Sequence, residues 1–404
     1  MPSISTFRRS PAGALVLAAL LLAGCGGGTE LLRGGTSKVG GGSSHAAQQI
    51  GFPAIATKNT TRVAGSDPVA DAAGVALAVY PSEASGTHPH VVTIAPTDTW
   101  QAALAASVLM APPIKAPILL SGGSSLPSAT SDALKTLAPT GSGSTAGAQV
   151  IMVGNVPQPG GLRVVKIPGD GPYALAAAID RFSSAAAGKT SSDVMITSAD
   201  DPAYAMPAAG FAAESGDPIL FVNGSGVPPQ TRQALLAHQN PHIYVVGPPS
   251  IIPASVVKQL KRFGTVKRVG ADGPAANAVA FAGYRDPACP FGQPCAHVPG
   301  SFGWALRSPG HGYVLVNDQR TLDAAAAAPL SASGQYGPLL LINDSSAMPQ
   351  AVLNYFLNYA TPGYTQEGPT AAVYNHGWVI GDPSAISVSV QSEMDTLLEA
   401  VPQK

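Results

Sequence analysis

The sequence predicts an α/β protein built from three tandem modules, each an open parallel sheet, arranged with pseudo-threefold symmetry. Three observations lead to this fold class. The phrase APILLSGGSSLP at 116–127 recurs as DPILFVNGSGVP at 217–228 and as GPLLLINDSSAMP at 337–349. A Gly- and Pro-containing lead segment (61–78, 165–182 and 267–284) recurs at intervals of about 100 residues, and strand-like and helix-like segments alternate between these landmarks.

Each module begins with a lead segment, which predicts a short strand, a turn and a helix. The prolines at Pro68, Pro172 and Pro274 suit the first turn of a helix, where a missing N–H costs nothing. A basic residue stands six positions before each proline. These residues are Arg62, Lys166 and Arg268, and we expect them to occupy equivalent places and to supply charge to a ligand site, although structural pairing is the alternative.

A buried strand follows the helix of each lead segment. The runs VVTIA, VMITS and YVLVN are apolar on both faces, as in a parallel sheet that helices cover on both sides. Short connections between strand and helix favour right-handed crossovers.

The repeated phrase reads as the next strand and the turn after it. A proline can begin a strand, the apolar residues are expected to fill the centre of the sheet, and a second proline opens the next helix. The turns 122–125, 223–226 and 343–346 lie at strand ends beside helix starts, where backbone N–H groups can bind anions. The candidate ligand-binding residues in these turns are Gly122, Ser124, Asn223, Ser225, Asn343 and Ser345. The strand motif comprises Pro117, Ile118, Leu119, Leu120, Pro218, Ile219, Leu220, Phe221, Pro338, Leu339, Leu340 and Leu341.

The N-terminus carries an export signal. Arg8 and Arg9 precede the short apolar run GALVLAALLLAG, which is typical of a signal peptide over residues 1–24. The segment Leu22–Cys25 resembles the lipobox of bacterial lipoproteins, which implies lipidation of Cys25 and a membrane anchor. Residues 25–60 are Gly-rich and predict a flexible tether.

Two further cysteines, Cys289 and Cys295, lie close together in DPACPFGQPCAH. In an exported protein this spacing favours a local disulfide. Metal binding with His297 is the alternative, but these ligands form an incomplete set, so no metal site is expected.

Composition and motifs argue against several function classes. Charged residues make up 11% of the chain and the net charge is −1, so no overall field favours nucleic acid. The sequence contains no HExxH, nucleophile elbow, Walker motif or dinucleotide fingerprint. We therefore expect neither catalysis nor a cofactor.

The ordered repetition of lead segment, small-residue helix, PILL-like strand and VVG-like strand resembles the cell wall binding repeat 2 family. The resemblance implies three Rossmann- or flavodoxin-like repeats that bind an anionic secondary polymer of the bacterial wall noncovalently. The repeats would span 61–164, 165–266 and 267–404, with an insertion at 285–310. It also implies a protein of the cell envelope, on the extracytoplasmic side of the membrane.

The lead segments depart from that family, because Pro replaces an expected Arg in GSDPVADA, GDGPYALA and GADGPAANA. The only dense basic cluster comprises Lys258, Lys261, Arg262, Lys267 and Arg268. Two other functions therefore stay open: a solute-binding lipoprotein of a transporter, and a surface scaffold with a protein partner.

Overall fold

The structure is a computed structural model that describes residues 54–287, 301–364, 368 and 372–402. Cys25, Cys289, Cys295, the signal peptide and most of the tether lie outside these residues. Within the described part of the chain, no helix is both long and apolar enough to cross a membrane.

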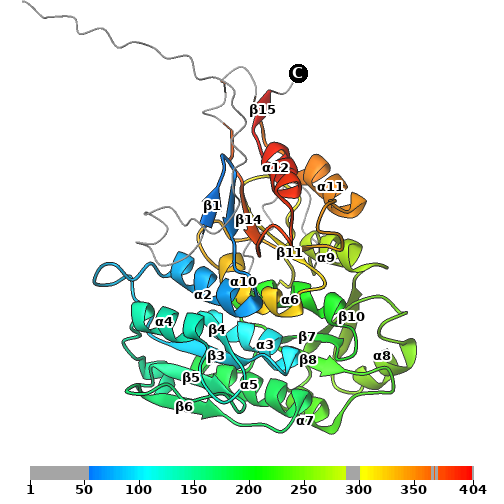
Figure 1. The fold of residues 1–404 in the computed structure, drawn as a ribbon. Coiled ribbons are helices and arrows are strands. Elements are labelled where there is room, and N and C mark those ends of the chain that lie inside the picture. Colours follow the sequence, from blue (N-terminus) through cyan, green and yellow to red (C-terminus); the bar gives the residue numbers. More distant parts are fainter. Residues whose placement is uncertain (1–53, 288–300, 365–367, 369–371, 403–404) are drawn as a thin grey trace, which may run out of the picture. The chain divides into compact units, whose positions relative to one another are not determined.

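The described residues form three main sheets, and in each of them four parallel strands have the same order (Figure 1). In two of the sheets, the strand that is second along the chain lies at one edge, followed by the first, third and fourth. In the remaining sheet the last of these places is taken by a strand from the N-terminal end of the described chain. This order and the alternating helices confirm the predicted fold class. The first sheet contains β4 (Ile118–Ser121), β3 (Val92–Pro96), β5 (Val150–Val153) and β6 (Val164–Ile167). The second contains β8 (Ile219–Val222), β7 (Asp193–Ser198), β9 (His242–Val246) and β10 (Thr265–Val269).

The third sheet is completed by the N-terminal end of the described chain. Its strands are β12 (Leu339–Ile342), β11 (Gly312–Asn317), β14 (His376–Ile380) and β2 (Thr60–Val63), and β1 (Ala54–Ala56) adds an antiparallel edge. Thr61 of β2 lies opposite Trp378 of β14. The first described strands therefore lie beside strands near the C-terminus, as the blue and red ribbons of Figure 1 show.

The sheets are offset by one strand from the sequence repeats. The strand of each lead segment (β2, β6 or β10) is the fourth strand of the preceding sheet, while the helix after it packs on the sheet that follows. These lead helices are α2 (Pro68–Val79), α5 (Pro172–Ala187) and α9 (Pro274–Ala282), and they contact β4, β8 and β12 respectively. Each lead segment therefore links two neighbouring modules.

The remaining helices connect the strands or follow them. They are α4 (Ser128–Leu137), η2 (Gly143–Thr145), α7 (Pro229–Ala237), α8 (Ala254–Leu260), α11 (Gln350–Tyr355), η3 (Phe356–Ala360) and α12 (Val388–Leu397). A small two-stranded sheet pairs β13 (Gly363–Tyr364) with β15 (Val401–Pro402).

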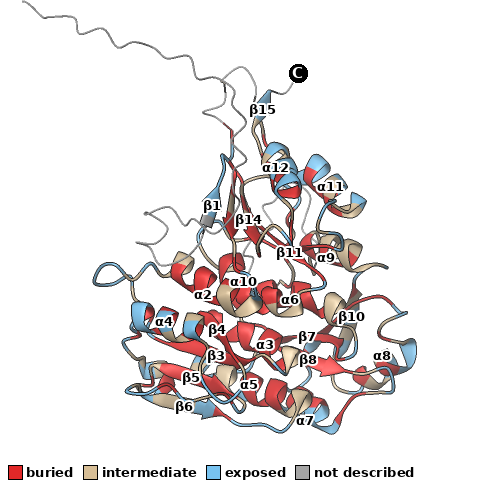
Figure 2. Cartoon of the chain, in the orientation of Figure 1, coloured by how far each residue is buried: buried red, intermediate tan, exposed pale blue. Residues whose placement is uncertain are grey.

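Three helices rich in small residues pack against one another at the centre of the fold (Figure 2). They are α3 (Trp100–Ala105) with its continuation η1 (Ala106–Met110), α6 (Pro202–Ser215) and α10 (Thr321–Ser331). Alanine is their most frequent buried residue, and its short side chain allows the helix backbones to approach closely. The approach is tightest at Gly210, where an added Cβ would lie 2.6 Å from Ser331 Oγ.

The PILL-like strands are sheet edges, so the expectation that they fill the sheet centres was wrong. They are nevertheless fully buried, because a helix of another module covers each edge. β4 contacts α10, β8 contacts α3, and β12 contacts α6. Edge placement also explains why proline can precede each strand, since no neighbour lies on the outer side to require its N–H.

An ionic cluster lies where the third module meets α2. Arg320 Nη2 lies 2.6 Å from Asp71 Oδ2, and Arg320 Nε lies 2.6 Å from Asp323 Oδ2. Both carboxyl groups are fully buried, with one guanidinium between them. Burial and the neighbouring Asp323 raise the pKa of Asp71 well above its usual range, although Arg320 opposes the shift. The pKa of Asp71 is therefore higher in the folded protein than in the unfolded chain.

The described ends of the predicted insertion 285–310 belong to the core. Phe302 stacks on Tyr244 with ring centroids 3.6 Å apart, and Trp304 packs edge-on against Phe211 of α6. Phe302 and Trp304 are buried, so this part of the insertion seals the contact between the second and third modules.

Replacing Gly210 with Ala tests the helix contact at the centre. In the wild-type background we expect Gly210→Ala to lower the free energy of unfolding, because its Cβ meets Ser331. In a Ser331→Gly background the clash is absent, so the same change should raise the free energy of unfolding by up to about 1 kcal/mol through helix propensity. Denaturant midpoints of the four chains measure this reversal of sign. Equal effects in both backgrounds would refute the contact.

The Asp71–Arg320–Asp323 cluster predicts how stability depends on pH. Because the pKa of Asp71 is raised on folding, its contribution is fully present below the unfolded pKa of about 4 and declines as pH rises. Asp71→Asn keeps a neutral donor at this position, so we expect a flatter decline in unfolding free energy between pH 5 and 9. Asp170→Asn, at an exposed position in the equivalent turn of the second lead segment, is the matched control for charge. A pH profile unchanged by Asp71→Asn would contradict the assignment.

Candidate functional site

The three predicted basic residues do not form one surface. Arg62 is fully buried in β2, where Nη1 donates to the Gly381 carbonyl at 2.8 Å and Nε donates to Gln391 Oε1 at 2.8 Å. Burial lowers the pKa of Arg62 to about 10, so the group stays charged at neutral pH. A guanidinium held in this way supports the fold and cannot contact a polymer from this position.

Arg268 has the same role in the second sheet. Its guanidinium donates to the carbonyls of Gly247 and Ile252, in the loop after β9. Gly247 and Gly381 each follow the third strand of their sheet, so the two arginines hold equivalent loops. Lys166 is exposed, and no hydrogen bond to it is found among the described residues. Arg62, Lys166 and Arg268 lie in β2, β6 and β10, which take the same place in their sheets. The surroundings of the three side chains differ.

The turn after β8 is closed by its own side chain. Asn223 Oδ1 accepts hydrogen bonds from the N–H groups of Ser225 and Gly226, at 3.1 and 3.0 Å. Asp200 also accepts from the N–H of Gly224. The expectation that this turn offers free N–H groups to an anion is therefore wrong.

The turn after β12 is closed in the same way, but one residue later. Asp344 Oδ1 accepts from the N–H and the hydroxyl of Ser346, at 2.8 and 2.7 Å. These hydrogen bonds lower the pKa of Asp344. Asp344 and Ser346 thus take the places of Asn223 and Ser225, while the predicted Asn343 and Ser345 are displaced by one position. A carboxylate in this turn repels anions.

The turn after β4 is different because it has no such internal acceptor. Gly123 and Ser124 are exposed, and no hydrogen bond from their N–H groups is found in the described structure. An added Cβ at Gly122 would lie 2.1 Å from Thr97 Oγ1, so a larger residue here would force the Thr97 hydroxyl to rotate away. This turn therefore keeps the open geometry that the sequence predicted for all three.

A cavity of about 380 Å³ lies beside this turn. Its walls come from the starts of α2 and α4, from the end of β3 and from α10 of the third module. The lining residues include Asp67, Thr97, Pro127, Ser128 and Leu322. Segments far apart in the sequence thus converge where the first module meets the third.

The two helix N-termini at this cavity differ in charge. At α2, Asp67 Oδ1 accepts from the N–H groups of Val69 and Ala70, so this end already holds a carboxylate. At α4 the capping position is Pro127, which has no side-chain acceptor. The first-turn N–H groups of α4 therefore stay open beside the cavity, and such groups attract anions.

Metal binding has no support in the described residues, where no group of three or more His, Cys, Asp or Glu residues comes together.

Residues 166–257 match the family model Cell wall binding domain 2 (CWB2). This match confirms the resemblance over that segment, which runs from β6 to α8. The comparison with curated protein sequences gave no match.

Two solved structures share the fold. Cwp6 from Clostridium difficile superposes with a TM-score of 0.63 at 16% identity, covering 84% of this chain and 48% of that one. Cwp8 from the same organism gives a TM-score of 0.61 at 16% identity, with 85% and 52% covered. The chain thus spans about half the length of these two proteins. At this identity the likeness concerns the fold.

Sequence reasoning missed what distinguishes the turns. An Asn or Asp side chain at the start of a turn can accept hydrogen bonds from the N–H groups that follow it. Asn223 and Asp344 begin their turns in this way. The turn 122–125 begins with Gly122, which has no side-chain acceptor.

The burial of Arg62 predicts an effect on stability rather than on ligand binding alone. Arg62→Met leaves Gln391 and two carbonyl groups without their donor, so we expect the free energy of unfolding to fall by about 2 kcal/mol or more. Lys166→Met, at the equivalent exposed position, should change it by less than about 0.5 kcal/mol. Denaturant unfolding of both variants measures the difference. Equal midpoints would show that Arg62 does not stabilise the fold.

Proposed function

We propose that the chain binds an anionic polymer of the cell envelope noncovalently and performs no chemistry on it. The CWB2 match supports the ligand class, and the carboxyl-edge cavity at the first module supports the place. The observation that carries the proposal is the open N-terminus of α4 beside the unblocked turn at Gly122–Ser125. The start of α4 lines a cavity of about 380 Å³, and the turn contacts this cavity through Thr97, which faces Gly122.

We also propose that export and a lipid on Cys25 hold the protein on the extracytoplasmic side of the membrane. The Gly-rich residues 26–53 would then give the described part of the chain reach toward the wall. The lipobox-like Leu22–Cys25 is the feature that supports this part of the proposal.

The proposed site has no cationic side chain among the described residues in its lining. Asp67 adds a carboxylate whose charge the N–H groups of Val69 and Ala70 partly offset. Backbone dipoles at the start of α4 must therefore supply the attraction. Binding should therefore depend on salt less steeply than that of a protein with many lysine–phosphate contacts. A slope of about −1 or shallower in log affinity against log salt is expected.

Co-sedimentation with purified, protein-free wall sacculi tests the proposal. The chain carries Cys25→Ser to prevent lipidation, and sacculi are used before and after their anionic polymers are removed. We expect binding to intact sacculi and its loss on stripped sacculi. Ser128→Glu places a carboxylate at the start of α4 and should weaken binding about tenfold or more.

Thr136→Glu is the matched control, since it adds the same charge at an exposed position near the other end of α4. It should leave binding unchanged. Equal binding of wild type and Ser128→Glu would exclude this cavity as the site. A folded chain that does not sediment with intact sacculi would contradict polymer binding itself and favour a solute receptor or a protein scaffold.

A further inference from the structure

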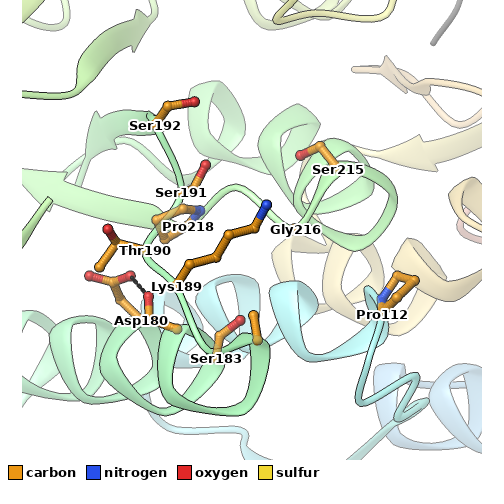
Figure 3. Close-up of a pocket in the computed structure, with 12 residues that line it drawn as sticks. Pro112, Asp180, Ser183, Lys189, Thr190, Ser191, Ser192, Ser215, Gly216 and Pro218 are labelled. Carbon is orange, nitrogen blue, oxygen red and sulfur yellow. Dashed lines mark hydrogen bonds between the residues drawn. The ribbon is translucent and has the colours of Figure 1, made fainter. Parts of the chain in front are cut away.

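A second cavity, of about 400 Å³, lies at the opposite edge of the second sheet (Figure 3). The ends of α5 and α6 form its walls together with the connection Gly188–Ser192, and Pro112 of the first module closes one side. β7 and β8 begin beside it, so it lies at the amino ends of the strands. It therefore shares no lining residue with the candidate polymer site.

Hydroxyl groups dominate the lining of this cavity. One carboxylate, Asp180, and one ammonium group, Lys189, accompany them, and the Lys189 side chain extends across the space toward Gly216 in Figure 3. The apolar contribution comes from Pro112, Pro218 and Ala187. The hydroxyl-bearing residues are Ser183, Ser184, Thr190, Ser191, Ser192 and Ser215.

A rigid hydrogen-bonded layer supports these groups. The Asp180 side chain is 4% exposed, and His238 Nε2 lies 3.0 Å from its Oδ2. His238 Nδ1 contacts the Ser191 carbonyl at 2.8 Å, so both ring nitrogens face acceptors. Burial acts against the charged ring, but the hydrogen bond with Asp180 prevails and raises the pKa of His238. The Ser191 hydroxyl in turn donates to the buried Asp217 at 2.6 Å.

In the other two modules, the segment between the lead helix and the next strand carries an aromatic residue near the amino ends of the strands. After α2, the Tyr80 hydroxyl donates to the Lys115 carbonyl, just before β4. After α9, Trp304 packs between Phe211 and Tyr336, with ring centroids 5.3 and 6.4 Å apart. The connection Gly188–Ser192 is the shortest of the three and contains no aromatic residue. The second module therefore keeps open a space of the kind that side-chain rings occupy in its neighbours.

We propose that this cavity binds a single sugar ring, neutral and rich in hydroxyl groups. A pyranose has the ring shape that Tyr80 and Trp304 bring to the other modules. Ser184, Ser191, Ser192 and Ser215 already have partners within the protein, and both Asp180 oxygens face His238. The sugar would therefore be held by the Ser183 and Thr190 hydroxyls and by charge-assisted hydrogen bonds from the Lys189 ammonium. The proline rings offer an apolar face for the C–H groups of the sugar.

This inference goes beyond the proposed function, because it concerns a different edge of the molecule and an uncharged ligand. Binding at one site does not require binding at the other. The second site would let the protein contact a neutral sugar of the envelope while its opposite edge holds an anionic polymer.

Amide NMR of the full chain with Cys25→Ser tests the proposal. The probes are methyl glycosides of glucose, galactose, mannose and N-acetylglucosamine, titrated to about ten times a millimolar dissociation constant. We expect at least one of them to shift the amide signals of Ser191, Ser192 and Gly216 in a saturable way. Lys189→Ala should weaken that binding about threefold or more.

A matched pair of tryptophan variants decides whether the cavity is responsible. Ala187 lines the cavity at the end of α5, whereas Ala185 is exposed on the same helix turn and does not line it. Ala187→Trp should fill the space and abolish the shifts, while Ala185→Trp should retain them. Both variants should still sediment with sacculi if the polymer site is correct.

Two results would overturn the inference. One is the absence of saturable shifts with any of the four glycosides in a folded chain. The other is equal binding by the Ala187→Trp and wild-type chains. Because sedimentation is read separately, failure here is distinguishable from failure of polymer binding.

Discussion

The close packing of three helices rich in small residues is the constraint on which the rest of the fold depends. α3 with η1, α6 and α10 contact one another through alanine, and through Gly210 opposite Ser331. Each of these helices also covers an edge strand of a different module. Larger side chains would separate the helices and expose three apolar strand edges, which are prone to pair with other chains. The central contact therefore both joins the modules and protects them.

The lead segments provide the second level of connection. Each one gives its strand to one sheet and its helix to the next, so no module has a complete sheet made from its own sequence repeat. The buried Arg62 and the partly buried Arg268 reinforce this exchange, because they sit in the strands of lead segments and hold the loops of the preceding sheet. At the remaining junction the equivalent residue is Lys166. One repeated sequence unit has thus acquired different polar chemistry at each junction.

The sequence was sufficient to predict the α/β class, the three repeats and the edge of the sheets at which the turns lie. The repeat interval and the alternation of apolar strands with helices determine those features. Both are kept when individual side chains change. It was not sufficient to predict which sheet the strand of each lead segment joins, because a parallel strand can extend either neighbouring sheet with the same local pattern. The sequence was also not sufficient to predict the roles of Arg62 and of the turn residues. Whether an arginine is buried, or an amide is already satisfied by Asn223 or Asp344, depends on contacts that repeat spacing does not specify.

The pairing of β2 with β14 has a consequence for how the chain comes to be folded. Thr60 lies beside Gly377, so the last sheet receives its fourth strand only after nearly the whole polypeptide has been synthesised. Contacts of such high sequence separation carry a large loop-closure entropy and slow the final stage of folding. Until then, β2 lacks the strand with which it pairs, and α2 lacks its contact with α10.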